Sequence, residues 1–250
     1  MANVNVDELR QLLTLDLNAK IQKTVAKIME FYNAMEGKVY ISFSGGKDSQ
    51  ILLHIARQLL PNITAVFCNT GNENPSIVKH VKTFDNVEII RPKKTIKEVI
   101  IEKGYPVISK EFSQEFAISQ RSPNGKTMLR KFISDETKDR WSYRQWKFLF
   151  EANIYPVNSI VLFPVSYSCC EYLKKKPFKE YEEKNKVSPI LGILAMESSL
   201  RKRQWLTTGC NIFNDRRNIS KPLSFWTEQD ILEYIRRTGI KIADCYGDII

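Results

Sequence analysis

The sequence has few histidines and cysteines, with two and five among 250 residues. No stretch of about 20 residues is both apolar and uncharged, as a membrane-spanning helix requires. Residues 1–6 lack the basic and apolar regions of a signal peptide. An odd number of cysteines without such a peptide argues against a disulfide-stapled fold. These absences predict a protein with no membrane partner, located in the cytoplasm, whose thiols are free, metal-bound or catalytic.

The composition is that of a chain able to bury a sizeable core. Hydrophobic residues make up 43% and charged residues 26%, as in ordinary globular domains. The length suits one α/β domain, or one domain with an appended lobe. The net charge of +10 favours anionic partners such as nucleotides or nucleic acid, or it serves solubility alone.

The first hundred residues alternate between short apolar runs and helical patterns. An N-terminal helix is predicted over 7–36, with Asp7 as its cap and Gly37 at its end. Strands alternating with helices at this spacing favour a parallel, twisted sheet with helices on both faces, the Rossmann-like α/β class. The predicted strands are 39–43, 63–67 and 87–90, and the predicted helices that follow them are 49–60, 75–84 and 95–103.

The pattern is lost in an insertion at about 109–157, where basic residues alternate with aromatic ones. Such a stretch can contact a nucleic-acid backbone, or it can be a solvated insertion with aromatic core residues. Strands are predicted again at 159–165 and 190–195, and a helix at 227–237. We therefore expect a single domain over 1–250, with a C-terminal helical lobe at about 196–250.

The loop after the first predicted strand reads Ser44-Gly45-Gly46-Lys47-Asp48-Ser49. Glycines let the backbone approach a ligand closely, and the following helix directs its N–H groups and positive end to the same place. Lys47 adds a positive charge, whereas Asp48 would tie the loop together or approach Mg²⁺. The loop is not a Walker A motif, because Asp48 follows the lysine, and it lacks the third glycine of the dinucleotide fingerprint.

The loop resembles the PP-loop of the ATP pyrophosphatase superfamily, whose pattern is Ser-Gly-Gly-x-Asp-Ser. The resemblance implies an adenine nucleotide alpha hydrolase-like fold that binds ATP with Mg²⁺. It assigns catalytic roles to Lys47 and Asp48. The nucleotide-binding residues that it implies in this segment are Ser42, Ser44, Gly45, Gly46, Lys47, Asp48 and Ser49.

Later motifs resemble the phosphoadenylyl-sulfate reductase branch of that superfamily. Asn69-Thr70-Gly71 is similar to the Asp-Thr-Gly turn beside the adenosine. Residues 192–201 look like Gly-x-Arg-Ala-x-Glu-Ser-x-x-Arg, with Gly192, Glu197 and Arg201 matching and Leu194 in place of the first arginine. Without that guanidinium the grip on phosphate or sulfate differs. Taken alone, Glu197 and Arg201 also fit an ordinary surface ion pair. Pro222-Leu223, Trp226 and Asp230 match a further helix motif of the branch.

The double cysteine Cys169-Cys170 is similar to a segment of the iron–sulfur members of the branch, which hold a cluster through four thiolates. The resemblance makes Cys169, Cys170 and Cys210 candidate cluster ligands. Cys245 is either a fourth ligand or a buried apolar residue. The sequence contains no Cys-x-x-Cys and no C-terminal Glu-Cys-Gly, which the reductases carry.

Three functions follow from these resemblances. The first is an ATP pyrophosphatase that cleaves at the α-phosphate in sulfur transfer, similar to the enzymes of DNA phosphorothioation, with nucleic acid and a sulfur-donor protein as candidate partners. The second is a reductase of phosphoadenylyl or adenylyl sulfate, which the missing thiol elements disfavour. The third is a nucleotide-binding subunit that performs no chemistry of its own. The sequence predicts neither the oligomeric state nor the sulfur acceptor.

Overall fold

The computed structural model describes residues 6–107, 110–121, 164–214 and 217–247. The chain divides into two compact units. The first comprises residues 1–91 and 178–250, and the second comprises residues 92–177. Each unit is described by itself below.

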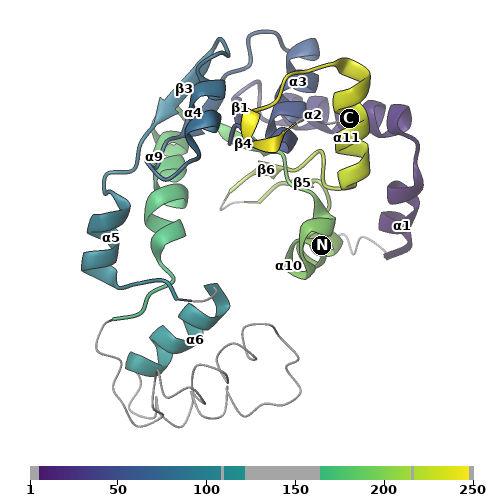
Figure 1. Cartoon of the computed structure of the whole chain (residues 1–250). Coiled ribbons are helices and arrows are strands. Elements are labelled where there is room, and N and C mark those ends of the chain that lie inside the picture. Colours follow the sequence, from purple (N-terminus) through teal and green to yellow (C-terminus); the bar gives the residue numbers. More distant parts are fainter. Residues whose placement is uncertain (1–5, 108–109, 122–163, 215–216, 248–250) are drawn as a thin grey trace. The chain divides into compact units, whose positions relative to one another are not determined.

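A six-stranded, mostly parallel sheet forms the centre of the first unit (Figure 1). Its strand order is β3-β2-β1-β4-β6-β5, and only β5 pairs in the antiparallel sense. Strand β1 therefore lies between β2 and β4, with Ile41 opposite Ala65 on one side and Ile190 on the other. The strands are β1 (Val39–Ser42), β2 (Ala65–Cys68), β3 (Val87–Ile90), β4 (Ser188–Leu191), β5 (Asn211–Ile212) and β6 (Ile219–Ser220).

Helices follow the strands as the alternating pattern predicts, and the α/β class with a parallel sheet is confirmed. The helices of the first unit are α1 (Val6–Thr14), α2 (Leu17–Ala34), α3 (Lys47–Leu59), α4 (Pro75–Val81), α10 (Ser199–Thr208) and α11 (Glu228–Thr238), together with most of α9 (Lys176–Asn185). Two 3₁₀ turns, η2 (Ala195–Glu197) and η3 (Asp244–Tyr246), complete it. The strand predicted at 190–195 lies at 188–191 instead, because the chain leaves the sheet after β4 and turns into η2.

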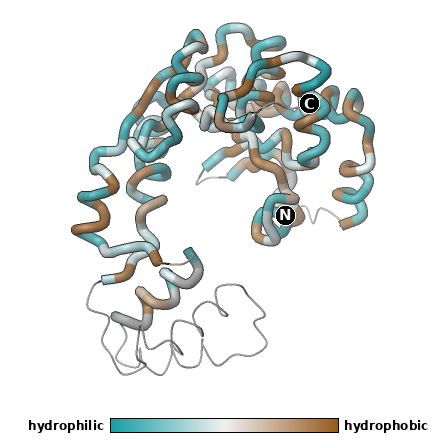
Figure 2. Tube along the Cα trace, in the orientation of Figure 1, coloured by the Kyte–Doolittle hydropathy of each residue, from teal (hydrophilic) through white to brown (hydrophobic). Residues whose placement is uncertain are grey.

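Both faces of the sheet are covered. Val39, Ile41 and Phe43 alternate along β1 and join the main hydrophobic core with residues of α2, α3 and α11. Tyr40 points the opposite way, where its ring packs against Phe178 and Tyr181 of α9. Figure 2 shows hydrophobic and hydrophilic residues alternating along the helices of this unit, as expected when one face of each helix is buried.

The N-terminal segment forms two helices, which are divided at Leu15–Asp16. Asp16 is the N-cap of α2, because its carboxylate accepts a hydrogen bond from the Ala19 N–H at 2.9 Å. The cap predicted at Asp7 is wrong, since α1 already begins at Val6 and Asp7 lies in its first turn. Gly37 follows α2 with φ +75°, in keeping with its predicted role.

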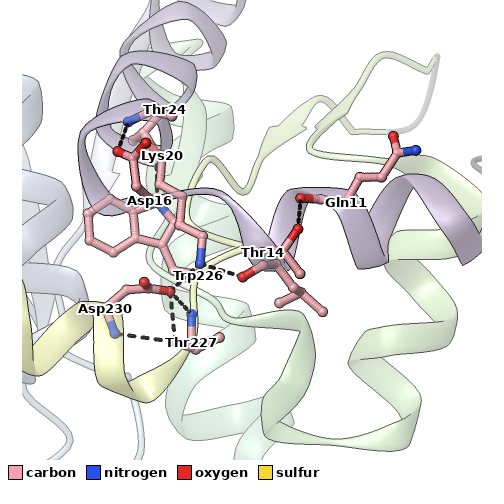
Figure 3. Close-up of polar contacts among 10 residues, drawn as sticks. Gln11, Thr14, Asp16, Lys20, Thr24, Trp226, Thr227 and Asp230 are labelled. Atoms are coloured by element: carbon pink, nitrogen blue, oxygen red, sulfur yellow. Dashed lines mark hydrogen bonds and ion pairs between the residues drawn. The ribbon is translucent and has the colours of Figure 1, made fainter.

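A buried ion pair ties the start of α2 to the start of α11 (Figure 3). The Lys20 ammonium donates to Asp230 Oδ2 at 2.6 Å and to the Leu13 carbonyl at 2.9 Å. The Lys20 side chain is only 2% exposed. Asp230 also completes a capping box with Thr227, which begins α11 where the sequence predicts. The Trp226 indole donates to Thr24 Oγ1 at 2.9 Å, so the Trp-x-x-x-Asp motif acts here as a structural anchor.

The second unit contains helix α5 (Ile96–Lys103), helix α6 (Lys110–Arg121) and a π-helical turn, η1 (Glu171–Lys175). Thr95 and Glu98 form the capping box of α5. The strand predicted at 159–165 and most of the predicted basic insertion lie outside the described residues. Among those described, Val165 bridges Tyr105. No helix in the described ranges is long and apolar enough to cross a membrane.

Candidate nucleotide-binding site

The predicted glycine loop connects β1 to α3 at the carboxyl edge of the sheet. Gly45 has φ +71°, a conformation that favours glycine. A Cβ at this position would also lie 2.7 Å from methyl groups of Ile77 and Val81 in α4. Gly46 is the N-cap of α3 and provides no side-chain cap. The first N–H groups of α3 therefore lack both intrahelical partners and a capping side chain, as in a helix that meets an anion.

Two serines hold the loop in shape. The Ser49 hydroxyl donates to the Gly46 carbonyl at 2.9 Å and lies 3.0 Å from the Ser44 hydroxyl. It also accepts the Ser44 N–H at 3.2 Å. Ser49 is buried whereas Ser44 is exposed. Ser49 thus stabilises the loop from its buried side, and Ser44, which also accepts the Gly46 N–H at 3.3 Å, lies on its exposed side.

Lys47 and Asp48 lie side by side at the start of α3. The Lys47 ammonium contacts Asp48 Oδ1 at 3.1 Å and Glu228 Oε1 at 3.0 Å. Burial lowers the pKa of Lys47, but the hydrogen bond to Glu228 and the charge of Asp48 outweigh it, so the net shift is upward. Burial raises the pKa of Asp48, and Lys47 opposes that shift only in part. An ionised Asp48 is thus costly to the fold at this position.

A pocket of about 300 Å³ opens above the loop. It brings together residues from four parts of the first unit: the end of β1, the loop, the segment after β4, and the C-terminal 3₁₀ turn. Of the residues predicted from the motifs, its lining includes Ser42, Ser44, Gly46, Lys47, Asp48, Ser49, Gly192, Glu197 and Arg201. Gly45 does not line the pocket, because its role is the backbone turn against α4.

Gly192 lets the chain after β4 approach the start of α3. A Cβ at Gly192 would lie 2.9 Å from the Ser49 Cα and 3.0 Å from the Asp48 carbonyl. These are backbone atoms, which cannot move aside cheaply. Gly192 therefore sets the width of the pocket at the phosphate-binding loop.

Glu197 and Arg201 form an ion pair, as their spacing predicts. Glu197 ends η2 and Arg201 lies in the first turn of α10, where its N–H is capped by Ser198 Oγ at 3.2 Å. Glu197 also accepts the Leu194 N–H at 3.2 Å. Both side chains are about 40% exposed and line the pocket. The ion pair is therefore placed where it can contact a ligand.

The turn Asn69-Thr70-Gly71 follows β2 on the same edge of the sheet but does not line this pocket. Asn69 Oδ1 accepts the Gly71 N–H at 3.0 Å. The backbone N–H and hydroxyl of Thr70 both donate to Glu73, at 2.9 and 2.8 Å. The turn is therefore a preformed loop, and its contact with an adenosine stays a prediction.

The three cysteines predicted to hold a cluster belong to different units. Cys169 and Cys170 lie in the second unit, and buried Cys210 lies in the first, with its sulfur 3.4 Å from Ser224 Oγ. Burial and the neighbouring Cys170 raise the pKa of the Cys169 thiol. Within the described residues of either unit, no group of three or more His, Cys, Asp or Glu side chains could hold a metal ion. The iron–sulfur cluster stays a prediction.

The remaining cysteines are Cys68, which is buried at the end of β2, and Cys245 in η3. Cys245 is exposed, so its interpretation as a buried apolar residue is wrong. Its backbone N–H donates to Ser76 Oγ at 3.2 Å, which attaches η3 to α4.

Two residues close to Lys47 escaped the sequence analysis. Glu228 reaches Lys47 across 181 positions of sequence, and Tyr246 places its ring 5.9 Å from the Lys47 ammonium. The Tyr246 hydroxyl also lies only 3.0 Å from where a Gly46 Cβ would be. The signal for Glu228 was its place in the first turn after the Pro-Leu-x-x-Trp motif. Nothing in the sequence singled out Tyr246.

The residues present fit a phosphate chain and a divalent cation. The uncapped start of α3, the Lys47 ammonium and the Arg201 guanidinium are donors for anionic oxygens. The carboxylates of Asp48, Glu197 and Glu228 would repel bare phosphates. A Mg²⁺ ion, which binds one or two carboxylates together with phosphate oxygens, removes that conflict.

Residues 38–117 match the family model of the phosphoadenosine phosphosulfate reductase domain. The matched segment begins just before β1 and contains the glycine loop, α3 and the turn after β2. This match supports the reductase-like branch of the PP-loop superfamily, as the motifs indicate. No curated protein is significantly similar to the chain in sequence.

A solved structure with the same fold is the crystal structure of phosphoadenylyl-sulfate (PAPS) reductase from Candida auris, in a phosphate complex. The two chains are 12% identical, with a TM-score of 0.50, and the similarity covers 98% of this chain and 92% of that one. At this identity the likeness shows the fold alone, and it confirms the Rossmann-like α/β architecture.

Proposed function

We propose that this chain is a sulfur-transfer enzyme that binds ATP in the loop 44–49 and cleaves it between the α- and β-phosphates. The observation that carries the proposal is the loop itself. Gly45 turns the backbone in a left-handed conformation, and the uncapped start of α3 and Lys47 then lie at one pocket. This segment matches a family model named for a phosphoadenosine phosphosulfate reductase domain.

In the proposed reaction an acceptor oxygen attacks the α-phosphorus and the bond to the bridging oxygen of the β-phosphate breaks. Pyrophosphate leaves, and the acceptor carries the adenylyl group until a sulfur nucleophile displaces AMP. Lys47 and the N–H groups of α3 stabilise the charge that gathers on the departing pyrophosphate. Asp48, with Glu228 beside it, would hold Mg²⁺, which when bound neutralises phosphate charge.

A second candidate is reduction of phosphoadenylyl or adenylyl sulfate. The exposed thiol of Cys245 directly precedes Tyr246, which lines the pocket. In this reaction the thiolate would attack the sulfur and the nucleotide phosphate would leave. A thiol reductant would then release sulfite from the resulting thiosulfonate. The third candidate is nucleotide binding without chemistry.

The deciding experiment mixes protein purified without oxygen with Mg²⁺ and ATP and assays pyrophosphate against phosphate. Lys47→Ala is expected to lower pyrophosphate release by about 10²- to 10³-fold, because it removes a preorganised charge from the leaving group. Lys38→Ala is the matched control, since Lys38 is exposed and its ammonium pairs with the exposed Glu36, outside the pocket. Tight binding of adenylyl sulfate without pyrophosphate release would contradict the proposal and favour the reductase candidate. ATP binding without turnover would favour a nucleotide-binding subunit.

A further inference from the structure

A second pocket of about 590 Å³ lies in the first unit, between α10 and the β5–β6 hairpin. Gln204 and Thr208 of α10 line one side, and Asn214, Arg217 and Lys221 line the other, with isoleucines of the hairpin between them. Its size is that of a small-molecule site. None of the motifs that predict the nucleotide site assigns a role to it.

The positive charges of Arg217 and Lys221, which both line this pocket, differ in whether a carboxylate neutralises them. Arg217 donates to Glu182 through Nε at 2.8 Å and through a terminal nitrogen at 2.5 Å, and Tyr40 donates to the same carboxylate at 2.7 Å. The guanidinium is thus neutralised and fixed as part of the wall. For Lys221, the described part of the chain provides neither a hydrogen-bond acceptor nor a carboxylate for the ammonium group. A half-buried positive charge without a partner is unfavourable unless an anion binds.

Helix α10 connects this pocket to the nucleotide pocket. Arg201, Gln204 and Thr208 are three and seven residues apart, so they share one face of the helix. Arg201 lines the nucleotide pocket and the other two line the second one. Seven residues of helix span about 10 Å, so a group held in one pocket lies within reach of the other. Burial and the charge of Arg201 lower the pKa of Lys221, in agreement with two cations placed close together.

We propose that this second pocket binds a nucleotide of the acceptor, with its phosphate on Lys221. The proposal rests on the proposed function, which requires an acceptor beside the α-phosphate. The carboxamide of Gln204 offers hydrogen bonds to a sugar or base, and the isoleucines offer an apolar wall to a base. Inorganic phosphate alone would leave most of this volume unfilled. Lys221 is then a positioning residue for the acceptor.

The test measures binding of two probes to the full chain carrying Lys47→Ala, so that the first pocket is weakened. One probe is thymidine 5′-monophosphate, and the other is a fluorescent single-stranded thymidine oligonucleotide of about 12 nucleotides, a typical site length. Adding Lys221→Gln is expected to weaken binding about tenfold, as for a lost charge-assisted hydrogen bond. For the oligonucleotide, the slope of log affinity against log salt should fall by about one.

The matched control is Lys202→Gln, which removes the same charge from an exposed position of α10 that does not line the pocket. Loss with both probes identifies a free nucleotide as the ligand, and loss with the oligonucleotide alone identifies a strand. Equal loss in both variants, or no loss with Lys221→Gln, overturns the proposal. If wild-type protein releases no pyrophosphate while Lys221-dependent binding persists, the proposed function fails and the pocket assignment stands.

Discussion

At the scale of single residues, the loop shows how one position can serve function at a cost to the fold. Asp48 is largely withdrawn from water, and the nearby Glu228 adds a second negative charge. Burial raises the pKa of Asp48, so the ionised carboxylate is less stable in the folded chain than in the unfolded one. A carboxylate held in such a place is typical of a functional site.

We expect Asp48→Asn to leave the free energy of unfolding unchanged or to increase it, while weakening Mg²⁺-dependent ATP binding. The amide keeps the shape and removes the charge that burial disfavours and that a cation requires. Urea unfolding and calorimetric titration with and without Mg²⁺ measure the two effects. A destabilised variant with normal Mg²⁺ dependence would show that Asp48 only braces the loop.

Gly45 is the residue on which the loop conformation depends. Gly45→Ala must place a side chain at φ +71° and against Ile77 and Val81. Gly239→Ala faces only the first problem, since its φ is +64° with open space around it. We expect the Gly239 variant to lose about 1 kcal/mol of folding free energy, the usual cost of a left-handed residue, and the Gly45 variant to lose clearly more. Urea unfolding of both variants measures the difference, and equal losses would contradict the packing argument.

At the scale of elements, α11 links the N-terminal helices to the nucleotide pocket. Asp230, in the capping box of this helix, accepts a hydrogen bond from the buried Lys20 ammonium. Glu228, the first residue of the helix, contacts the Lys47 ammonium. The first turn of α11 is therefore attached to α2 through Asp230 and to α3 through Glu228. Trp226 and Thr24 fix the approach to it, as Figure 3 shows.

Breaking the Lys20–Asp230 pair on one side should be strongly destabilising. Asp230→Ala leaves the Lys20 ammonium buried without its carboxylate and removes the Asp230 half of the capping box with Thr227, so we expect a loss of about 3–5 kcal/mol in the free energy of unfolding. Adding Lys20→Met removes the stranded charge and should restore part of that loss. Chemical denaturation of the single and double variants tests the coupling, which would be refuted by strictly additive effects.

At the scale of the whole molecule, the two histidines are the only side chains whose usual pKa lies between about 5 and 7. His54 contacts the Tyr234 hydroxyl at 2.8 Å, and His80 contacts Gln50 Oε1 at 2.9 Å. Burial lowers the pKa of both imidazoles, with Asp244 partly opposing the shift at His80. Both imidazoles thus have structural partners.

This arrangement predicts the sign of the pH dependence. A histidine whose folded pKa is depressed binds protons more readily in the unfolded chain, so stability is full above about pH 6.5 and declines as the pH falls below it. Urea midpoints at about pH 7 and about pH 5.5 should therefore differ, with the lower value at acid pH. The double variant His54→Gln, His80→Gln should reduce that difference, and an unchanged difference would assign it to other groups.

The sequence by itself determined the local parts of this protein. The alternation of short apolar runs with helical patterns gave the parallel sheet, because backbone geometry imposes periods of two and 3.6 on burial. The Ser-Gly-Gly-Lys-Asp-Ser loop and the start of the helix at Thr227 were readable for the same reason, since each depends on neighbours within a few residues.

Only the tertiary structure decided which distant residues complete the site. Glu228 and Tyr246 meet Lys47 because the first turn of α11 and the turn η3 both lie beside the start of α3, and no local pattern records such a meeting. The motif pointed to Gly192, but its close approach to the backbone of α3 is visible only in the folded chain. The same holds for Lys221, beside which the described residues place no carboxylate. Contacts between residues far apart in sequence depend on how the helices and strands pack together. The strand order and the packing therefore decide which side chains meet at the site.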